Sequence, residues 1–160
     1  MEKIVIAILL SLLPISELRG GLIYAIASGI NPIFAFFICV IANMLVAPAL
    51  FLFLSTLHNF LYKIKIYRKF FDAYIKTLNK KVEIYERKHR LLGYFALTLF
   101  TAIPLPFTGA WTSSFIAWIL GLNKKKSIIA INLGVIIAGI IVLLFILGIF
   151  NFLNFLIKAK

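Results

Sequence analysis

Four long apolar blocks, separated by short polar segments, dominate the pattern of the chain. They run over Ile4–Ala27, Ile33–Leu57, Leu91–Leu122 and Ile128–Ile157. A helix of about 20 apolar residues spans the hydrocarbon core of a bilayer, and the blocks are long enough for that purpose. The pattern therefore predicts an all-α integral membrane protein, with a single membrane domain over residues 1–160 and no separate soluble domain.

The first and third blocks are interrupted at their centres by residues that a spanning helix avoids. The interruptions are Leu13–Gly21 and Ile103–Trp111, and both contain proline and glycine, which disturb helical backbone. Irregular backbone is not tolerated in lipid, so each break must be buried in protein or line a wet cavity. The flanking apolar pieces of 10–13 residues reach roughly 15–20 Å, about half of the hydrocarbon thickness. We therefore expect two re-entrant helical hairpins, at about residues 4–29 and 91–122.

Hairpins and spans together form a repeating pattern. The second and fourth blocks carry no charge and predict transmembrane helices at about residues 33–57 and 128–157. Pro14 and Pro104 lie 90 residues apart, and Asn43 and Asn132 match one residue out of that register. Because a hairpin returns to the side on which it started, each repeat adds one crossing. We therefore expect two inverted repeats, over residues 1–57 and 91–160, a common plan among transporters.

The segment between the repeats, residues 58–90, is basic and amphipathic. Between Lys63 and Arg90 it carries ten Lys or Arg, and apolar residues recur at helical spacing from Tyr67 to Tyr85. A basic amphipathic helix lying on the inner leaflet is one interpretation of this connector. An ordinary cytoplasmic linker helix is the other, and the sequence leaves both open.

Positive charge favours one orientation in the membrane. Ten basic residues of the connector and three at Lys124–Lys126 fall on one side, against Lys3, Lys158 and Lys160 on the other. The positive-inside rule then predicts a multi-pass plasma-membrane protein with a cytoplasmic connector and two external termini. Four full crossings give the same charge difference with Lys124–Lys126 outside. The broken blocks, and not the charges, therefore favour two crossings.

Composition and charge exclude several other classes of protein. The chain is 63% hydrophobic with a net charge of +12, and its basic residues flank the apolar blocks. We therefore expect membrane lipids with anionic headgroups as partners and no nucleic acid, while a homo-oligomer is left open. Cys39 lies inside an apolar block, and His58 and His89 have no acidic cluster nearby, so we expect no metal site and no other cofactor. Motifs typical of an enzyme are absent from the sequence.

Glu17 and Arg19 are the most informative candidate residues. A charged residue at bilayer depth costs roughly 2.5–3.5 kcal/mol to insert, so such residues usually serve a function. Their spacing points them apart on an unbroken helix, whereas at a turn both can face one cavity. The returning half-helices are expected to begin near Leu18 and Thr108, with N-termini that attract anions. Arg19 with these N-termini describes a site for a phosphate-like headgroup, while Glu17 could exchange a proton; the alternative is a pair that merely holds the hairpin tip.

The two breaks resemble the signature motifs of a known family. Glu17-Leu18-Arg19-Gly20-Gly21 and Ile103-Pro104-Leu105-Pro106-Phe107-Thr108-Gly109-Ala110-Trp111-Thr112 look like the two motifs of the small multidrug export protein family. That family is similar to the DedA and VTT-domain membrane proteins, and the resemblance implies opposed re-entrant hairpins and the movement of lipids. The candidate residues for substrate binding or coupling are Glu17, Arg19, Gly20, Pro104, Pro106, Thr108, Gly109, Trp111 and Thr112.

Three functions compete on this evidence. The first is a transporter, flippase or scramblase for an anionic lipid, with proton coupling through Glu17; the resemblance implies a polyprenyl-phosphate carrier as the leading substrate. The second is a proton-coupled exporter of small, cationic compounds that uses Glu17 as the exchanging carboxylate. The third is a membrane scaffold or lipid-binding protein without turnover. The first leads because Arg19 favours an anion over a cation.

Overall fold

The computed structural model describes residues 1–64, 68–69, 89–105 and 108–158. Within these ranges all the regular elements are helical, which confirms the all-α prediction. The helices are α1 (Glu2–Leu12), α2 (Glu17–Ala27), α3 (Pro32–Met44), α4 (Val46–Leu61), α6 (His89–Ala102), α7 (Ala110–Ile119) and α8 (Lys124–Lys158). Most of the basic connector predicted over residues 58–90 lies outside the described residues, as does Pro106.

A helix–turn–helix hairpin forms where the first break was predicted. Leu13, which follows α1, is extended with ψ 143° because a residue before proline is disfavoured in the helical region. The turn is closed where the Glu17 N–H donates to the Leu13 carbonyl over 3.0 Å and where the Ser16 hydroxyl bonds the Leu10 carbonyl. The two arms of 11 residues each are about 16 Å long, close to the half-length pieces expected.

The second break makes a looser turn between α6 and α7. Helix α6 ends at Ala102, two residues before Pro104, and α7 begins only at Ala110. The Thr108 hydroxyl lies 2.7 Å from the Ile103 carbonyl oxygen and 2.8 Å from that of Leu105. Both carbonyls lie beyond the last turn of α6 and also accept backbone hydrogen bonds from Leu105 and Thr108, so the Thr108 hydroxyl adds a second donor that closes the turn.

The span predicted at 33–57 is interrupted, which the sequence argument did not anticipate. Helix α3 ends at Met44 and α4 begins at Val46, with Leu45 between them. The cause is Pro48, whose ring clashes with the carbonyl of the residue four positions earlier, Met44. The other span, α8, is continuous over 35 residues. Two helical segments, Pro32–Phe60 and Lys124–Ile149, are long and apolar enough to cross a membrane.

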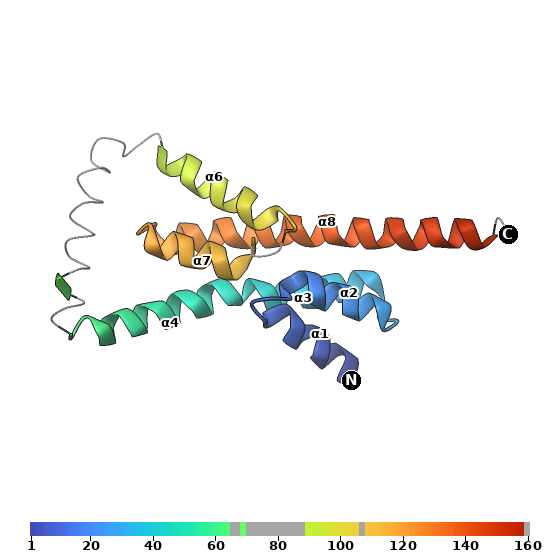
Figure 1. Ribbon diagram of the computed structural model, residues 1–160, viewed down its shortest axis with the longest axis horizontal. Coiled ribbons are helices and arrows are strands. Elements are labelled where there is room, and N and C mark those ends of the chain that lie inside the picture. The colour runs from blue at the N-terminus through green and yellow to red at the C-terminus, as the bar shows by residue number, and fades with distance from the viewer. Residues whose placement is uncertain (65–67, 70–88, 106–107, 159–160) are drawn as a thin grey trace.

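The two hairpins approach each other from opposite ends of the molecule (Figure 1). Helices α3 and α4 run one way and α8 runs back the other way, and α3 packs against α8. The first hairpin packs on α3 and α8, while α6 lies along α8 and α7 packs against α4 and α8. The tips of the hairpins meet where α3 joins α4, near the middle of the molecule (Figure 1).

Polarity is distributed as expected for a protein surrounded by lipid. Large apolar side chains are exposed on the outer faces of the helices, among them Phe37, Phe53 and Phe145. The buried interior instead contains a set of polar side chains: Ser11, Glu17, Asn43, Thr101, Ser113, Ser114 and Ser127. In water this arrangement would be unfavourable, because it exposes apolar side chains and buries polar groups. In a bilayer it is favourable, because the apolar side chains contact lipid and the polar groups are kept away from it.

Candidate functional site

Glu17 has an unusual backbone conformation at the start of α2. Its φ is +47°, and in the described ranges it is the one non-glycine residue with a positive φ. A side chain in this left-handed region costs of order 1–3 kcal/mol, and such residues cluster at functional sites. The conformation lets α2 begin directly after the turn, with the carboxylate aimed at the second hairpin.

The Glu17 carboxylate lies at the N-terminus of α7. Its Oε1 accepts a hydrogen bond from the Trp111 N–H over 3.4 Å, and Trp111 is the second residue of that helix. Gly109, just before α7, approaches so closely that a Cβ built on it would overlap the carboxylate. Free N–H groups and the helix dipole favour a negative charge at this position. A residue of the first hairpin therefore caps a helix of the second.

The Arg19 guanidinium lies at the opposite end of the same break. Its Nη1 donates to the Leu105 carbonyl, and its Nη2 lies 3.3 Å from the Ile103 carbonyl and 2.7 Å from the Thr108 carbonyl. The Thr108 hydroxyl is a further partner of Nη2, at 3.3 Å. The Ile103 and Leu105 carbonyls lie just beyond the C-terminus of α6, where the helix dipole favours a cation, whereas Thr108 lies next to the N-cap of α7. Glu17 and Arg19 thus straddle the second break, and each charge faces the helix end that complements it.

Trp111 adds a contact in the reverse direction. Its indole Nε1 donates to the Leu12 carbonyl at the end of α1 over 3.0 Å. Glu17, Arg19, Thr108, Gly109 and Trp111 are therefore brought together. The other candidates are not part of this contact: Gly20 packs against Ser16 within its own hairpin, Pro104 is exposed at the tip, and Thr112 lies half-buried on α7.

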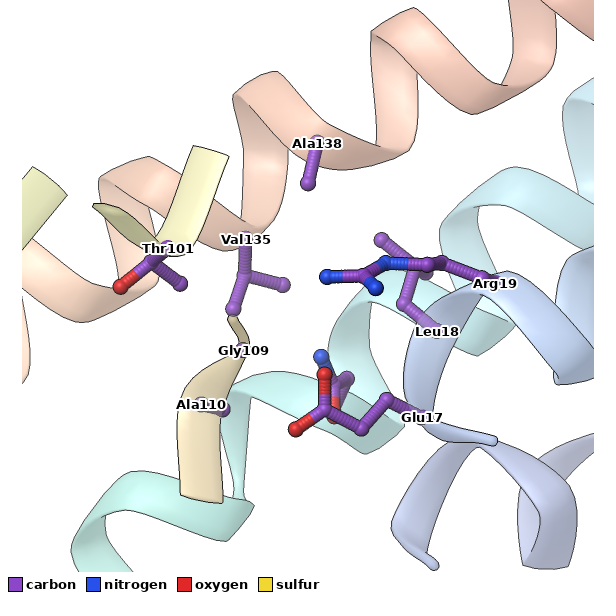
Figure 2. A pocket seen from close by; sticks show the side chains of 9 residues that line it. Glu17, Leu18, Arg19, Thr101, Gly109, Ala110, Val135 and Ala138 are labelled. Atoms are coloured by element: carbon purple, nitrogen blue, oxygen red, sulfur yellow. The ribbon is translucent and has the colours of Figure 1, made fainter. Parts of the chain in front are cut away.

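A small cavity of about 10 Å³ separates the two hairpins. Figure 2 shows Glu17 and Arg19 extending into it from α2, with the start of α7 and part of α8 opposite. It is lined by Glu17, Leu18, Arg19, Asn43, Thr101, Gly109, Ala110, Val135 and Ala138. A cavity of this size accommodates about one water molecule. Asn43 and Thr101 were missed as site residues, although a polar residue inside an uncharged span was the signal for Asn43.

Next to the hairpin tips lies a larger, apolar groove of about 490 Å³. Trp111 is part of its wall and also donates to Glu17, so the groove lies beside the charged contact. Its lining residues come from α4, α7, the end of α1 and the junction between α3 and α4: Leu12, Leu45, Val46, Ala49, Leu50, Phe53, Trp111 and Phe115. A volume of this order is typical of sites for small organic ligands.

Comparison with known families identifies the relatives of this chain. A family model described as "Putative small multi-drug export protein" matches residues 17–141, which include the Glu17–Gly21 part of the first break, the whole second break and the span between them. The chain belongs to this family. No curated protein and no solved structure gives a match. Together with its two long apolar helical segments, this membership makes the chain a membrane protein of a transport family and confirms the resemblance seen in the two motifs.

Similarity to the DedA and VTT-domain proteins stays a prediction. The matched family supplies the transport class, while the substrate and the arrangement in the membrane are not part of its description.

Proposed function

We propose that this protein moves an anionic lipid across the plasma membrane, with a polyprenyl-phosphate carrier as its substrate. The observation that carries the proposal is the set of partners of Arg19. Every hydrogen bond described for its guanidinium goes to neutral oxygens of the second break, and three of the four go to backbone carbonyls. A phosphate offers the guanidinium charged oxygens in the paired geometry that it prefers.

The N-terminus of α7 also favours binding of an anion at this place. The N–H of Trp111 at this helix N-terminus is occupied by the Glu17 carboxylate, which is itself an anion. Helix N-termini bind phosphate by the same free N–H groups and the same dipole. A phosphate could therefore replace Glu17 at α7 while Arg19 turns from the carbonyls of the second break to the phosphate. Protonation of Glu17 would favour this exchange, because a neutral carboxyl group competes less for the N–H.

Movement of the hairpin tips is required for this mechanism. The cavity between them, about 10 Å³, is far too small for a phosphate group, so the tips must separate to admit one. The neighbouring apolar groove of about 490 Å³ offers a place for the hydrocarbon chain while the headgroup reaches Arg19. Substrate binding would thus exchange contacts between the hairpins for contacts with the lipid.

The proposed membrane arrangement is two inverted repeats, each a re-entrant hairpin followed by a span. In support, the first hairpin and the end of α8 extend toward one end of the molecule, while α4 ends and α8 begins toward the other (Figure 1). Cysteines introduced at Asn31 and Lys125 should then react with impermeant reagents from opposite sides of the membrane. Reporters at Met1 and Lys160 should both be external. Internal termini would instead establish four crossings.

Export of small cationic compounds is the second candidate. The apolar groove beside the Glu17 carboxylate favours it, because an apolar body and a positive charge could be bound together there. The two functions differ in which charged residue holds the ligand. Lipid phosphate needs Arg19, whereas a cation needs Glu17.

Ligand binding to purified variants tests the proposal. A phosphorylated polyprenyl lipid should bind the parent protein, bind Arg19→Lys more weakly and fail to bind Arg19→Ala. It should still bind Glu17→Gln, whose transport should lose its pH dependence. Thr108→Val is the matched control, because it weakens the same contact between the hairpins while the arginine charge remains. Binding by native mass spectrometry that is lost equally in the control would indicate a damaged fold.

A cationic dye gives the opposite test on the same variants. Dye binding that disappears in Glu17→Gln and survives in Arg19→Ala would establish the exporter instead. If the parent protein binds neither ligand, Glu17 and Arg19 have a structural role, and the third hypothesis, a membrane scaffold, replaces both transport functions.

A further inference from the structure

Asn43 is a buried polar residue with an unused acceptor beside the charged pair. It lies near the end of α3, is only 2% exposed, and lines the cavity together with Glu17 and Arg19. Its Oδ1 has no hydrogen-bond partner among the described residues. A buried carbonyl oxygen that has lost its water without gaining a hydrogen bond is destabilising, so a donor is expected to reach it.

In the structure, neither of the other two polar side chains around the cavity donates to Asn43. The Thr101 hydroxyl already contacts the Leu97 carbonyl at 2.8 Å and the Ser113 hydroxyl at 2.6 Å. The Arg19 guanidinium is engaged by the second break through both Nη atoms. The remaining lining residues Leu18, Gly109, Ala110, Val135 and Ala138 have no polar side chain. Glu17 is therefore the group on the cavity wall whose proton, when bound, could serve Asn43.

A single water molecule fits between the two. The cavity volume of about 10 Å³ is close to the smallest that holds one water. Such a water needs two to four polar partners, and the Glu17 carboxyl group and Asn43 Oδ1 provide two. With Glu17 protonated, its O–H donates to the water and the water donates to Asn43. With Glu17 ionised, the water donates one hydrogen to each.

We infer that Glu17, one buried water and Asn43 form a proton-binding site at the contact between the hairpins. Asn43 is a positioning residue: it holds the water, and the water hydrogen-bonds both forms of the Glu17 carboxyl group. This inference rests on the proposed function, since it names the site through which proton binding would release Glu17 from α7.

The charged surroundings of Glu17 are simple. Among the described residues of the helices around it, Arg19 is the charged group that lines the same cavity. The other titratable residues on those helices all lie outside the cavity lining. They are Glu2 and Lys3 on α1, Tyr24 on α2, Cys39 on α3, His89, Arg90 and Tyr94 on α6, and Lys124, Lys125, Lys126 and Lys158 at the two ends of α8. Helix α7 carries none. A change at Asn43 therefore alters the hydration of Glu17 without changing a neighbouring charge.

Infrared spectroscopy of the protein in lipid bilayers tests the inference. A pH titration should show a carboxylic acid C=O band that is lost in Glu17→Gln. In Asn43→Leu, which has similar size but no acceptor, the band should shift to higher frequency because the hydrogen-bonded water is lost. Asn43→Thr keeps an oxygen acceptor and should keep a band close to that of the parent.

Asn132→Leu is the matched control, because Asn132 Oδ1 is also buried and unpartnered but does not line the cavity. A band that is absent from the parent, unchanged in Asn43→Leu, or shifted equally by Asn132→Leu would overturn the inference. Thermal unfolding of each variant shows whether it is still folded. If Asn43→Leu is unfolded, the band of Asn43→Thr decides whether the inference holds. Lipid binding on the same samples separates the two proposals: a band that behaves as expected in a protein that binds no phosphate lipid leaves the proton site and removes the anion function.

Discussion

The two hairpins occupy corresponding places in the chain but are built differently. In the first, α1 and α2 pack closely on each other, with Gly21 against Ser11. In the second, α6 and α7 make few contacts with each other and pack instead on α8 and α4. The first hairpin contributes charged side chains to the contact at the tips. The second contributes mainly backbone groups, exposed where α6 ends and α7 begins.

This difference explains how a carboxylate and a guanidinium can be accommodated in an apolar protein. A wide break leaves carbonyls outside the helical hydrogen-bond pattern after one helix and N–H groups at the start of the next, and such groups are costly in lipid when their bonding is incomplete. Arg19 and Glu17 satisfy the two sets, and in return the helix ends compensate the two charges. The tight turn of the first hairpin holds both side chains in place. Each hairpin therefore supplies hydrogen-bond partners that the other lacks.

The largest effect is expected from removing the guanidinium. Arg19→Ala leaves the Ile103, Leu105 and Thr108 carbonyls without this donor and should lower the free energy of unfolding by about 3 kcal/mol. Arg19→Lys keeps one donor nitrogen for these carbonyls, so it should lower the free energy of unfolding by about half as much. Denaturation in mixed micelles measures both. If Arg19→Ala is as stable as the parent, the second hairpin does not depend on the first, and the described difference between the hairpins is wrong.

A methyl group at Gly109 should push the tips apart. Its Cβ would overlap the Glu17 carboxylate, so Gly109→Ala should cost about 2 kcal/mol of unfolding free energy. The backbone of Gly109 is extended, so the cost arises from the contact and not from the conformation.

Two variants isolate the cause of the Gly109 effect. Gly93→Ala, with nothing near its added Cβ, is the control and should be neutral or slightly stabilising. In a Glu17→Ala background the Gly109→Ala cost should largely disappear. If it persists there, the Gly109 contact is with something other than the carboxylate.

Packing within each half should respond separately. Gly21→Ala places a Cβ 2.6 Å from the Ala7 carbonyl oxygen, and Gly134→Ala places one 2.5 Å from Thr101 Cβ. Each should cost about 1.5 kcal/mol by overpacking. Distances between spin labels on the helices show which contact gives way. Gly21→Ala should increase the distance between α1 and α2, and Gly134→Ala should increase the distance between α6 and α8. Widening of α6 from α7 in the second variant would contradict the packing described.

The smallest effect concerns the side-chain donor that, among the described residues, the second hairpin gives to the first. Trp111→Phe keeps most of the ring and removes the hydrogen bond to the Leu12 carbonyl, so it should cost about 1 kcal/mol. The same denaturation experiment measures it. A cost as large as that of Arg19→Ala would mean that Trp111, and not the charged pair, holds the tips together.

Much of the local structure was predictable because its causes are local. Pro14 and Pro104 disturb the helix wherever they lie, so the breaks and the half-length arms follow from the sequence. The interruption of the span at Leu45 had the same kind of cause in Pro48, and it was overlooked although the signal was present. Family membership was also visible, because both motifs are short and continuous.

The partners of the charged pair were not predictable in the same way. The sequence places Glu17 and Arg19 at a break and allows them to face one cavity, and it indicates that a charge at such depth needs compensation. It does not say that Arg19 lies against carbonyls 84 to 89 residues away, or that Glu17 caps α7. The expected open anion site is, in this structure, a cavity for about one water.

The membrane class, the helices, the two breaks and the charged residues that need partners in lipid all follow from the sequence. The partners of Glu17 and Arg19, and the places of Asn43 and Thr101 in the site, follow only from the tertiary structure. The physical reason is that helix formation and chain breaks depend on neighbours along the chain. Compensation of a buried charge depends instead on which distant backbone ends the packing of α3, α4 and α8 brings to the same point.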